Sequence, residues 1–211
     1  MARILITSGP TRQYLDPVRY LTNASSGRMG AALAAAAIEQ GHEVVIVSGP
    51  AEVEYPTEAT LVSVVSTEEM LTAAREVFVG CDGLIGAAAP CDYRPVQVES
   101  NKISKTGDPL RLNLIETDDV VATLGAEKDG RWVVGFALET EDHRLRALAK
   151  LERKCCDLIV SNGAEAMDAL DNRVEVLDPS GTVLKQIEGP KTLVAQEIMT
   201  VIGQRLIAQT K

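Results

Sequence analysis

Short aliphatic runs alternate with helical segments along most of this chain of 211 residues, and this alternation limits the folds that it can adopt. The apolar runs predict buried strands at Ile4–Thr7, Glu43–Ser48, Leu61–Val65, Gly83–Ala88, Trp132–Ala137 and Leu158–Ser161. Helices are predicted between them at Gly30–Gln40, after the capping box Ser66–Glu69, from Thr117 to about Ala126 and at Glu141–Lys154. Such chains form a mostly parallel sheet with helices on both faces, so we predict a Rossmann-like α/β fold.

Several segments depart from the alternation. Pro90–Gly107 has no period and predicts a long loop of the kind that often carries function. Leu110–Leu114 alternates strictly between leucine and polar residues, which predicts a half-exposed strand. Arg173–Leu177 and Val183–Ile187 predict an antiparallel hairpin at a sheet edge, and a terminal helix is predicted from Thr192 to about Gln209. We expect one domain, 1–211, with a flap at about 90–107 and the hairpin at about 173–187.

Composition excludes several classes of protein. The net charge of −9 would repel a nucleic-acid backbone, so no nucleic-acid partner is expected. No apolar stretch approaches the roughly 18 residues of a membrane span, and the N-terminus lacks the pattern of a secretory signal. The four cysteines form no C-x-x-C pair, which is typical of free thiols in a reducing compartment. We therefore expect a cytoplasmic protein without a membrane contact.

Ligands of open α/β sheets bind at the carboxyl ends of the strands, where three loops of this chain carry candidate chemistry. After the first strand, a polar loop, Thr11–Asn23, leads to Asn23-Ala24-Ser25-Ser26-Gly27-Arg28-Met29-Gly30 at a helix entrance. Small residues and hydroxyl groups there would let a phosphate reach backbone N–H groups at the positive end of the helix. A serine cap with a packing glycine would produce the same pattern, so both interpretations stay open.

The second and third loops are weaker signals. In Gly86–Arg94, a run of tiny residues permits close approach by a ring or sugar, and Asp92 could bind a hydroxyl or Mg²⁺ carried by phosphates. The alternative is an ordinary turn aspartate. In Asn101–Gly107, Lys102 and Lys105 could close over phosphates, or could belong to a solvated loop.

Several common motifs are absent. The chain has no G-x-x-x-x-G-K-[ST] motif and no G-x-G-x-x-G spacing after its first strand. The second strand ends in Val47-Ser48-Gly49 without an acidic residue for a ribose, which weakens a dinucleotide dehydrogenase interpretation. His42 and His143, the only histidines, lie outside any zinc or Ser-His-Asp motif.

Taken together, these segments closely resemble the bacterial phosphopantothenoylcysteine synthetase family. The resemblance runs along nearly the whole chain, and its motifs are Gly9-Pro10-Thr11-Arg12, Asp16-Pro17-Val18-Arg19-Tyr20, Asn23-x-Ser25-Ser26-Gly27-x-Met29-Gly30, Ala88-x-x-x-Asp92-Tyr93, Lys102-Ile103-x-Lys105, Val133-Val134-Gly135-Phe136-Ala137-x-Glu139-Thr140 and Asp157-Leu158-Ile159-Val160-x-Asn162.

The resemblance implies a ligase of coenzyme A biosynthesis. The carboxylate of 4′-phosphopantothenate would attack the α-phosphorus of CTP to give an acyl-cytidylate and pyrophosphate. The amine of L-cysteine would then displace CMP. Mg²⁺ is implied as the cation that accompanies CTP. No flavin is implied, because the flavin belongs to a decarboxylase domain that many bacterial versions carry ahead of this one; the chain begins at the first strand, so a stand-alone synthetase or an excised domain is expected.

The resemblance also implies residue roles. Asn23, Arg19 and Lys102 match the catalytic set, in which Asn23 contacts the acyl-nucleotide and Lys102 belongs to the flap. Phosphate binding is expected at Ser25, Ser26 and Gly27, with Asp92 as the metal contact. The residues that match nucleotide-binding positions are Gly86, Ala87, Ala88, Asp92, Lys102, Asp118, Asp119, Val120, Val121, Phe136, Lys150 and Lys154.

The chain departs from the family pattern at a few positions. Cys91 stands where small residues are usual, beside Pro90, and Ser104 interrupts a more basic run of the flap. Asp118 occupies a position that is often proline, which bears on nucleotide affinity. Members of the family resemble dimers with sites near the interface, so a homodimer is expected. Two other functions stay open: a Rossmann-type oxidoreductase with a nucleotide cofactor, and a non-catalytic nucleotide-binding sensor.

Overall fold

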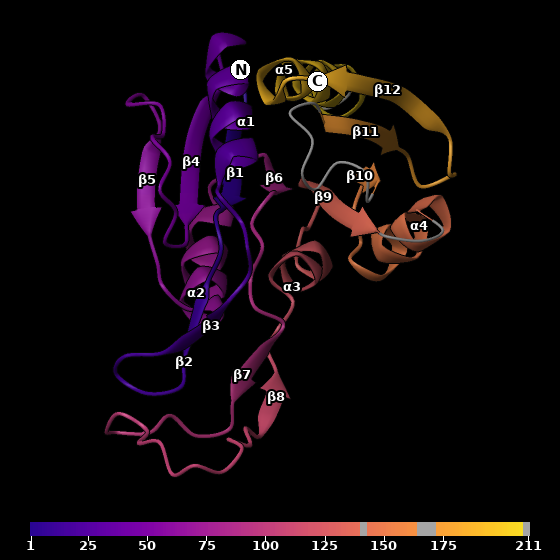
Figure 1. Cartoon of the computed structure of the whole chain (residues 1–211). Helices are drawn as coiled ribbons and strands as arrows, with labels where there is room; N and C mark the ends of the chain where they lie inside the picture. The colour runs from indigo at the N-terminus through magenta and orange to yellow at the C-terminus, as the bar shows by residue number, and fades with distance from the viewer. Residues whose placement is uncertain (140–142, 164–171, 209–211) are drawn as a thin grey trace.

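A computed structural model describes residues 1–139, 143–163 and 172–208 and contains one eight-stranded sheet at its centre (Figure 1). The strand order is β12-β11-β10-β9-β6-β1-β4-β5. The bounds of the strands are β1 Arg3–Ser8, β4 Glu43–Ser48, β5 Thr60–Ser63, β6 Gly83–Gly86, β9 Trp132–Glu139, β10 Leu158–Gly163, β11 Asn172–Leu177 and β12 Val183–Gly189. The six strands from β10 to β5 in this order pair in parallel, which confirms the predicted α/β class.

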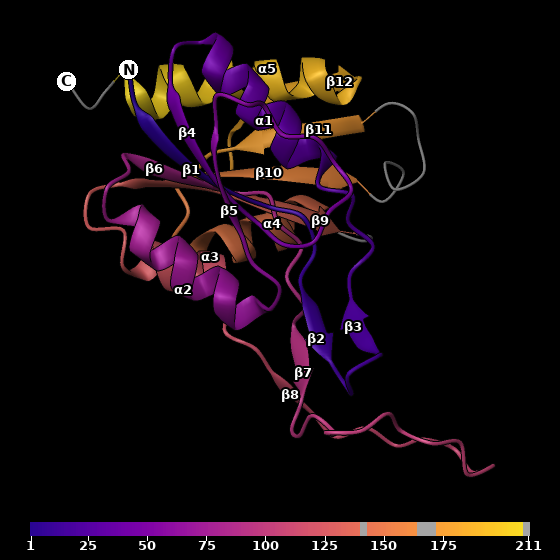
Figure 2. The same cartoon turned by 90° about the vertical axis from the view of Figure 1, so that its left-hand side faces the viewer.

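Helices cover both faces of the sheet, as the alternation of strands and helices predicts. Figure 2 shows α1 (Arg28–Glu39) and α5 (Lys191–Ile202) on one face, and α2 (Thr67–Phe78), α3 (Val120–Ala126) and α4 (His143–Arg153) on the other. A five-residue π-helix, η2 (Gly203–Ile207), continues α5. Successive residues of β1 point to opposite faces, so Ile4 and Ile6 enter the core beneath α1 and α5, whereas Leu5 enters the core of the other face.

Local signals set several of these boundaries. Ser66 accepts a hydrogen bond from the backbone N–H of Glu69, whose side chain returns to the Ser66 N–H, so the predicted capping box begins α2. Asp119 caps α3 through the N–H of Ala122. The predicted hairpin is present as the antiparallel pair β11 and β12, which extends the sheet at one edge.

Two antiparallel pairs lie beyond the carboxyl ends of the sheet strands (Figure 1). The expected polar loop 11–23 contains β2 (Arg12–Tyr14) and β3 (Tyr20–Thr22), and the expected flap contains β7 (Tyr93–Pro95), which pairs with β8 (Leu114–Glu116). Figure 2 shows the segment between β7 and β8 extending away from the sheet.

The prediction of a half-exposed strand at Leu110–Leu114 is wrong. Only Leu114 belongs to a strand, and residues 110 to 114 are all exposed, with Leu110 at 59%. An alternating sequence forms a strand only where a neighbouring strand supplies hydrogen bonds. Residues 110–113 have one such contact with the residues after β7, in which the Val96 N–H donates to the Asn113 carbonyl.

Other predicted boundaries shift by a few residues. The helix expected at Glu141–Lys154 is described from His143 to Arg153; Glu141, Asp142 and Gln209 lie outside the described residues. Within the described ranges, no helix is long and apolar enough to cross a membrane.

Candidate functional site

A cavity of about 380 Å³ opens at the carboxyl ends of β1, β6 and β9. It is the place where ligands bind in open α/β sheets. Most of the residues that we expected at a nucleotide meet there, from four separate parts of the chain. The lining consists of Thr7, Gly86, Ala88, Pro90, Cys91, Asp92, Tyr93, residues 116–122, Gly135, Phe136, Arg153 and Lys154.

The floor of this cavity, which we call the nucleotide cavity, depends on a close approach at Gly86. A Cβ atom at Gly86 would lie 2.4 Å from Cγ2 of Val121, at the start of α3. Carbon atoms this close repel strongly, so any side chain at position 86 would displace the helix start or fill the cavity. The small residue is therefore required by packing as well as by access of a ligand.

The charge on the cavity wall is organised by Asp119 and Lys154. Nζ of Lys154 lies 2.9 Å from Oδ2 of Asp119, and the Lys154 side chain is 18% exposed. Burial alone would raise the pKa of Asp119, but the charge of Lys154 and the hydrogen bond from Ala122 N–H hold it below its usual value. Asp119 is therefore an anion that fixes a cation at the cavity wall.

Asn23 joins the first and second candidate loops. Its Nδ2 donates to the carbonyl oxygens of Pro90, at 2.8 Å, and Ala89, at 3.3 Å, beside the nucleotide cavity. Pro10 and Ala89 also form a parallel bridge, and Ala89 N–H donates to the carbonyl of Gly9. These contacts hold the loops after β1 and β6 side by side.

A second cavity, which we call the serine cavity, includes Asn23 in its lining. It is lined by Pro10, Arg12, Tyr20, Thr22, Asn23, Ala24, Ser25, Ser26, Arg28, Pro50, Ala51 and Glu52. Arg12 and Arg28 give this cavity two cations, and the Arg12 guanidinium stacks over the ring of Tyr20 at 4.5 Å. The sequence assigned no role to either arginine, although Arg12 belongs to the motif Gly9-Pro10-Thr11-Arg12 and Arg28 lies within the predicted phosphate loop.

The start of α1 is not a serine cap. Its N-cap is Gly27, in the left-handed region with φ 73°, and no side chain caps the helix. Ser25 Oγ accepts only a long hydrogen bond of 3.4 Å from Gly27 N–H. A Cβ at Gly27 would lie 3.0 Å from Ala51 and 3.1 Å from the Tyr55 hydroxyl, so glycine is needed for both conformation and space. Phosphate binding by these residues stays a prediction.

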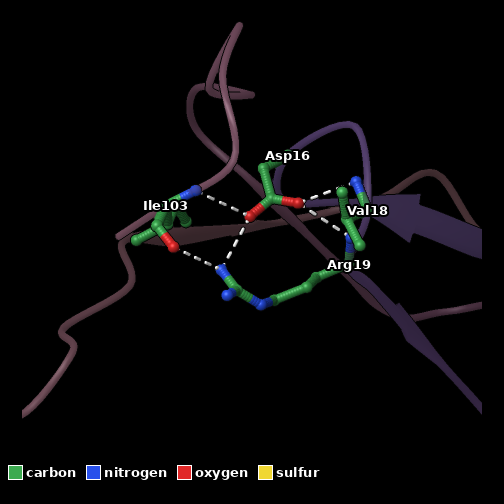
Figure 3. A network of polar contacts seen from close by, with 4 residues as sticks. All are labelled: Asp16, Val18, Arg19 and Ile103. Carbon is green, nitrogen blue, oxygen red and sulfur yellow. Dashed lines mark hydrogen bonds and ion pairs between the residues drawn. The ribbon is translucent and has the colours of Figure 1, made fainter. Parts of the chain in front are cut away.

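Lys102, the predicted flap lysine, lies outside the nucleotide cavity and outside the serine cavity. Lys102 is exposed and lines a third cavity with residues of the flap and Leu15. Arg19, expected at the substrate, binds Asp16 and the backbone carbonyl of Ile103 (Figure 3). Within one chain, Lys102 therefore does not line the nucleotide cavity.

Two other predicted residues fall outside the lining of the nucleotide cavity. Ala87 follows the end of β6, and its N–H donates to the carbonyl of Thr7. Lys150 does not line the cavity, whereas Arg153, three residues further along α4, does. The spacing of four residues favoured Lys150 as the partner of Lys154 on one helix face, but α4 ends at Arg153, so Lys154 lies beyond the helix and the helical spacing does not apply to it. The roles of Ala87, Lys102 and Lys150 stay predictions.

The parallel sheet, the cavity at its carboxyl edge and the glycine-capped helix beside it define a Rossmann-like α/β domain with a small-molecule site. The chain belongs to the family described as the DNA/pantothenate metabolism flavoprotein C-terminal domain, which matches residues 1–206.

Relatives and a solved structure agree with this assignment. The chain is 37% identical over 210 residues to the coenzyme A biosynthesis bifunctional protein CoaBC of Vibrio vulnificus, a match covering 95% of this chain and 52% of the relative. The chain is also 44% identical over 163 residues to the protein of the same name from Escherichia coli, and this match covers 75% of this chain and 40% of the relative. A crystal structure of the C-terminal domain of a CoaBC protein has 38% identity and a TM-score of 0.82, covering 98% of this chain and 96% of that one. The chain spans about half the length of the curated relatives it matches.

Proposed function

We propose that this domain joins 4′-phosphopantothenate to L-cysteine in coenzyme A biosynthesis, using CTP and releasing CMP and pyrophosphate. The observation that carries the proposal is the nucleotide cavity. It brings together nine residues that the family resemblance assigns to the nucleotide, namely Gly86, Ala88, Asp92, Asp118, Asp119, Val120, Val121, Phe136 and Lys154. Membership of a family whose relatives are named for coenzyme A biosynthesis supports the same reaction.

The first step forms an acyl-cytidylate. A carboxylate oxygen of 4′-phosphopantothenate attacks the α-phosphorus of CTP, a P–O bond forms, and the bond to the β-phosphate breaks to release pyrophosphate. Both reactants are anions, so the protein must hold them together against their repulsion. Lys154, fixed by Asp119, lines the nucleotide cavity, and Arg12 and Arg28 line the serine cavity together with Asn23.

The second step forms the amide. The amine nitrogen of L-cysteine attacks the acyl carbon, the bond from that carbon to the phosphate oxygen breaks, and CMP leaves while the amine loses a proton to water. Asn23 lines the serine cavity and donates to Pro90, which lines the nucleotide cavity, so its amide is suited to orient the acyl group. Ser25, Ser26 and Gly27, with the arginines beside them, are proposed to hold the phosphate of phosphopantothenate.

Mg²⁺ is proposed to accompany the nucleotide. Among the described residues no group of three or more acidic, histidine or cysteine side chains could hold a metal, and Asp92 is exposed at the cavity. This arrangement fits a cation that enters on phosphates with one carboxylate contact, because Mg²⁺ commonly binds in that way. When bound, the ion would neutralise charge on the triphosphate. No flavin is proposed for this domain.

One assay tests the proposal. The protein is incubated with 4′-phosphopantothenate, L-cysteine, Mg²⁺ and either CTP or ATP, and the products are identified by mass spectrometry. We expect 4′-phosphopantothenoylcysteine and CMP, with CTP preferred. Absence of the product with both nucleotides would exclude the ligase function.

Two other functions predict different outcomes. An oxidoreductase would bind a nicotinamide nucleotide and release no pyrophosphate. A nucleotide sensor would bind CTP without cysteine-dependent turnover and would retain binding when Lys102 is replaced. The absence of the G-x-G-x-x-G spacing after β1, and of an acidic residue at the end of β4 in Val47-Ser48-Gly49, weighs against the oxidoreductase.

We further propose that the protein acts as a homodimer in the cytoplasm. Six exposed aliphatic residues lie in the flap, in β8 and in the segment between them, namely Val96, Val98, Leu110, Leu112, Leu114 and Ile115. Burial of such a row against a second copy would remove apolar surface from water and bring a second flap near the site. The four free cysteines fit a reducing compartment.

Sedimentation tests the dimer. Leu112→Arg should shift the protein to a monomer, whereas Val79→Arg, at an exposed valine distant in sequence from the flap, should leave the dimer intact. A monomeric wild-type protein would contradict the proposal.

A further inference from the structure

A buried carboxylate ties Ile103 of the flap to the loop between β2 and β3 (Figure 3). The side chain of Asp16 has no exposed surface. Its Oδ1 accepts from the N–H groups of Val18 and Arg19, both at 2.8 Å. Its Oδ2 accepts from Nη1 of Arg19 at 2.8 Å and from the N–H of Ile103 at 3.1 Å. Asp16 is therefore fully engaged, and one of its partners lies 87 residues away in the flap.

Arg19 completes the connection. Its Nη1 also donates to the backbone carbonyl of Ile103 at 3.0 Å, so Asp16, Arg19 and Ile103 form a closed set of hydrogen bonds. Both backbone groups of Ile103 are thereby held, and Lys102 is the preceding residue. We call this arrangement the flap clasp.

Asp16 stays ionised although it is buried in the flap clasp. Burial alone would raise the pKa of Asp16, but the N–H groups of Val18, Ile103 and Arg19 and the Arg19 charge hold it below its usual value. The carboxylate is therefore ionised at neutral pH, and hydrogen bonds to a charged acceptor are stronger than neutral ones.

The clasp divides the flap into two parts. Glu99 N–H donates to the carbonyl of Leu15, which gives the flap a second contact with the same loop. Ile103 is half-buried, whereas residues 104 to 113 are all exposed. The docked part therefore ends at Ile103, directly after Lys102, so the clasp fixes the backbone from which the lysine projects.

We propose that Asp16 is a positioning residue, which together with Arg19 sets the place of the flap lysine. This inference rests on the proposed ligase function. Asp16 itself touches no substrate; it acts on the pyrophosphate-releasing step through Lys102. Arg19 and Lys102, which the family resemblance treats as separate contributors, move together if the clasp opens.

The first test is kinetic. Asp16→Asn keeps the shape but replaces one acceptor oxygen with a donor, so we expect pyrophosphate release in a single turnover to slow at least tenfold. Asp108→Asn, the same change at an exposed flap carboxylate, should stay within twofold of wild type. In a background of Lys102→Ala, the addition of Asp16→Asn should slow the step by less than twofold, since both changes remove one contribution. Independent, multiplying effects would overturn the proposal.

The second test is local and needs no activity. Trypsin can cut after Lys102, at the bond whose N–H the clasp holds, and after Lys105 in the exposed part. We expect wild type to be cut several-fold faster at Lys105, and Asp16→Asn to raise cutting at Lys102 to a similar rate. Unchanged protection of the bond after Lys102 in a folded Asp16→Asn variant would overturn the clasp.

A flap-side variant covers the case in which Asp16→Asn does not fold. Ile103→Pro removes the N–H that reaches Asp16 and also restricts the backbone of position 103 and of Lys102. Thr106→Pro, which restricts Lys105 in the same way, is its control in the exposed part. Ile103→Pro should reproduce the slow release, and normal release would contradict the inference. A wild-type protein that makes no product would instead refute the ligase proposal, while active wild type with an unaffected Asp16→Asn would refute the positioning role alone.

Discussion

Asp119 performs two structural tasks with one carboxylate: Oδ1 caps α3 by accepting from Ala122 N–H at 3.0 Å, and Oδ2 lies 2.9 Å from Nζ of Lys154. The start of a helix and a cation from α4 therefore meet at a single side chain on the wall of the nucleotide cavity. Because the two tasks use different chemistry, two substitutions can separate them.

Asp119→Asn should keep the cap and lose the ion pair, whereas Asp119→Ala should lose both. We expect the KM for CTP to rise about three- to tenfold in both variants, because Lys154 is no longer held. Only Asp119→Ala should also lose about 1 kcal/mol of unfolding free energy, the usual contribution of an N-cap. Initial rates at varied CTP and urea unfolding measure the two effects. A lower KM in Asp119→Asn would mean that the carboxylate repels the nucleotide more than it orders the lysine.

Gly86→Ala should weaken nucleotide binding by crowding. The new Cβ would lie 2.4 Å from Cγ2 of Val121, so the start of α3 must shift, with a cost of about 1–3 kcal/mol. Val121→Ala removes the clashing methyl group, so the double variant should recover most of the CTP affinity measured by calorimetry. Gly125→Ala makes a useful contrast, because its Cβ would meet the backbone oxygen of Lys154 at 2.0 Å and no side-chain change can relieve that clash.

Cys156 should make the fold less stable at alkaline pH. Burial raises the pKa of this thiol to about 12 from an ordinary value of 9.0. Above pH 9 the Cys156 thiol loses its proton in the unfolded chain but keeps it in the folded chain. The contribution of Cys156 to the free energy of unfolding is therefore complete below pH 9 and is lost as the pH rises toward 12. The loss approaches about 1.4 kcal/mol per pH unit. Urea unfolding at pH 8 and pH 10 measures the free energy of unfolding of wild type and of Cys156→Ala. The difference between the two proteins should change between these pH values, and a constant difference would contradict the prediction.

Lys102→Ala should slow pyrophosphate release by at least a hundredfold, because a cation that neutralises the triphosphate in the transition state would be lost. Release is followed in a single turnover with CTP and 4′-phosphopantothenate, without cysteine. Lys105→Ala, at the neighbouring exposed flap lysine, is the matched control and should show a much smaller effect. Near-normal release by Lys102→Ala would remove the flap from the mechanism.

The sequence by itself determined the architecture and the loops that carry the site. Aliphatic runs separated by helical segments predict a parallel sheet, and the capping signals at Ser66 and Asp119 lie where the helices begin. Such features are local, because periodicity and caps depend on residues within one or two turns. The carboxyl-end rule then placed the loops at Asn23 and Asp92 at one edge of the sheet.

Tertiary structure decided which of those residues meet. It placed Arg153 rather than Lys150 at the nucleotide cavity, left residues 110–113 outside any strand and joined Asp16 to Ile103 across 87 residues. Each outcome depends on a contact between segments distant in sequence, and neither spacing nor residue type specifies such a contact. Asp16 shows the difference: from the sequence it lies in a polar loop, and only the folded chain encloses it among four donors and ties it to the flap.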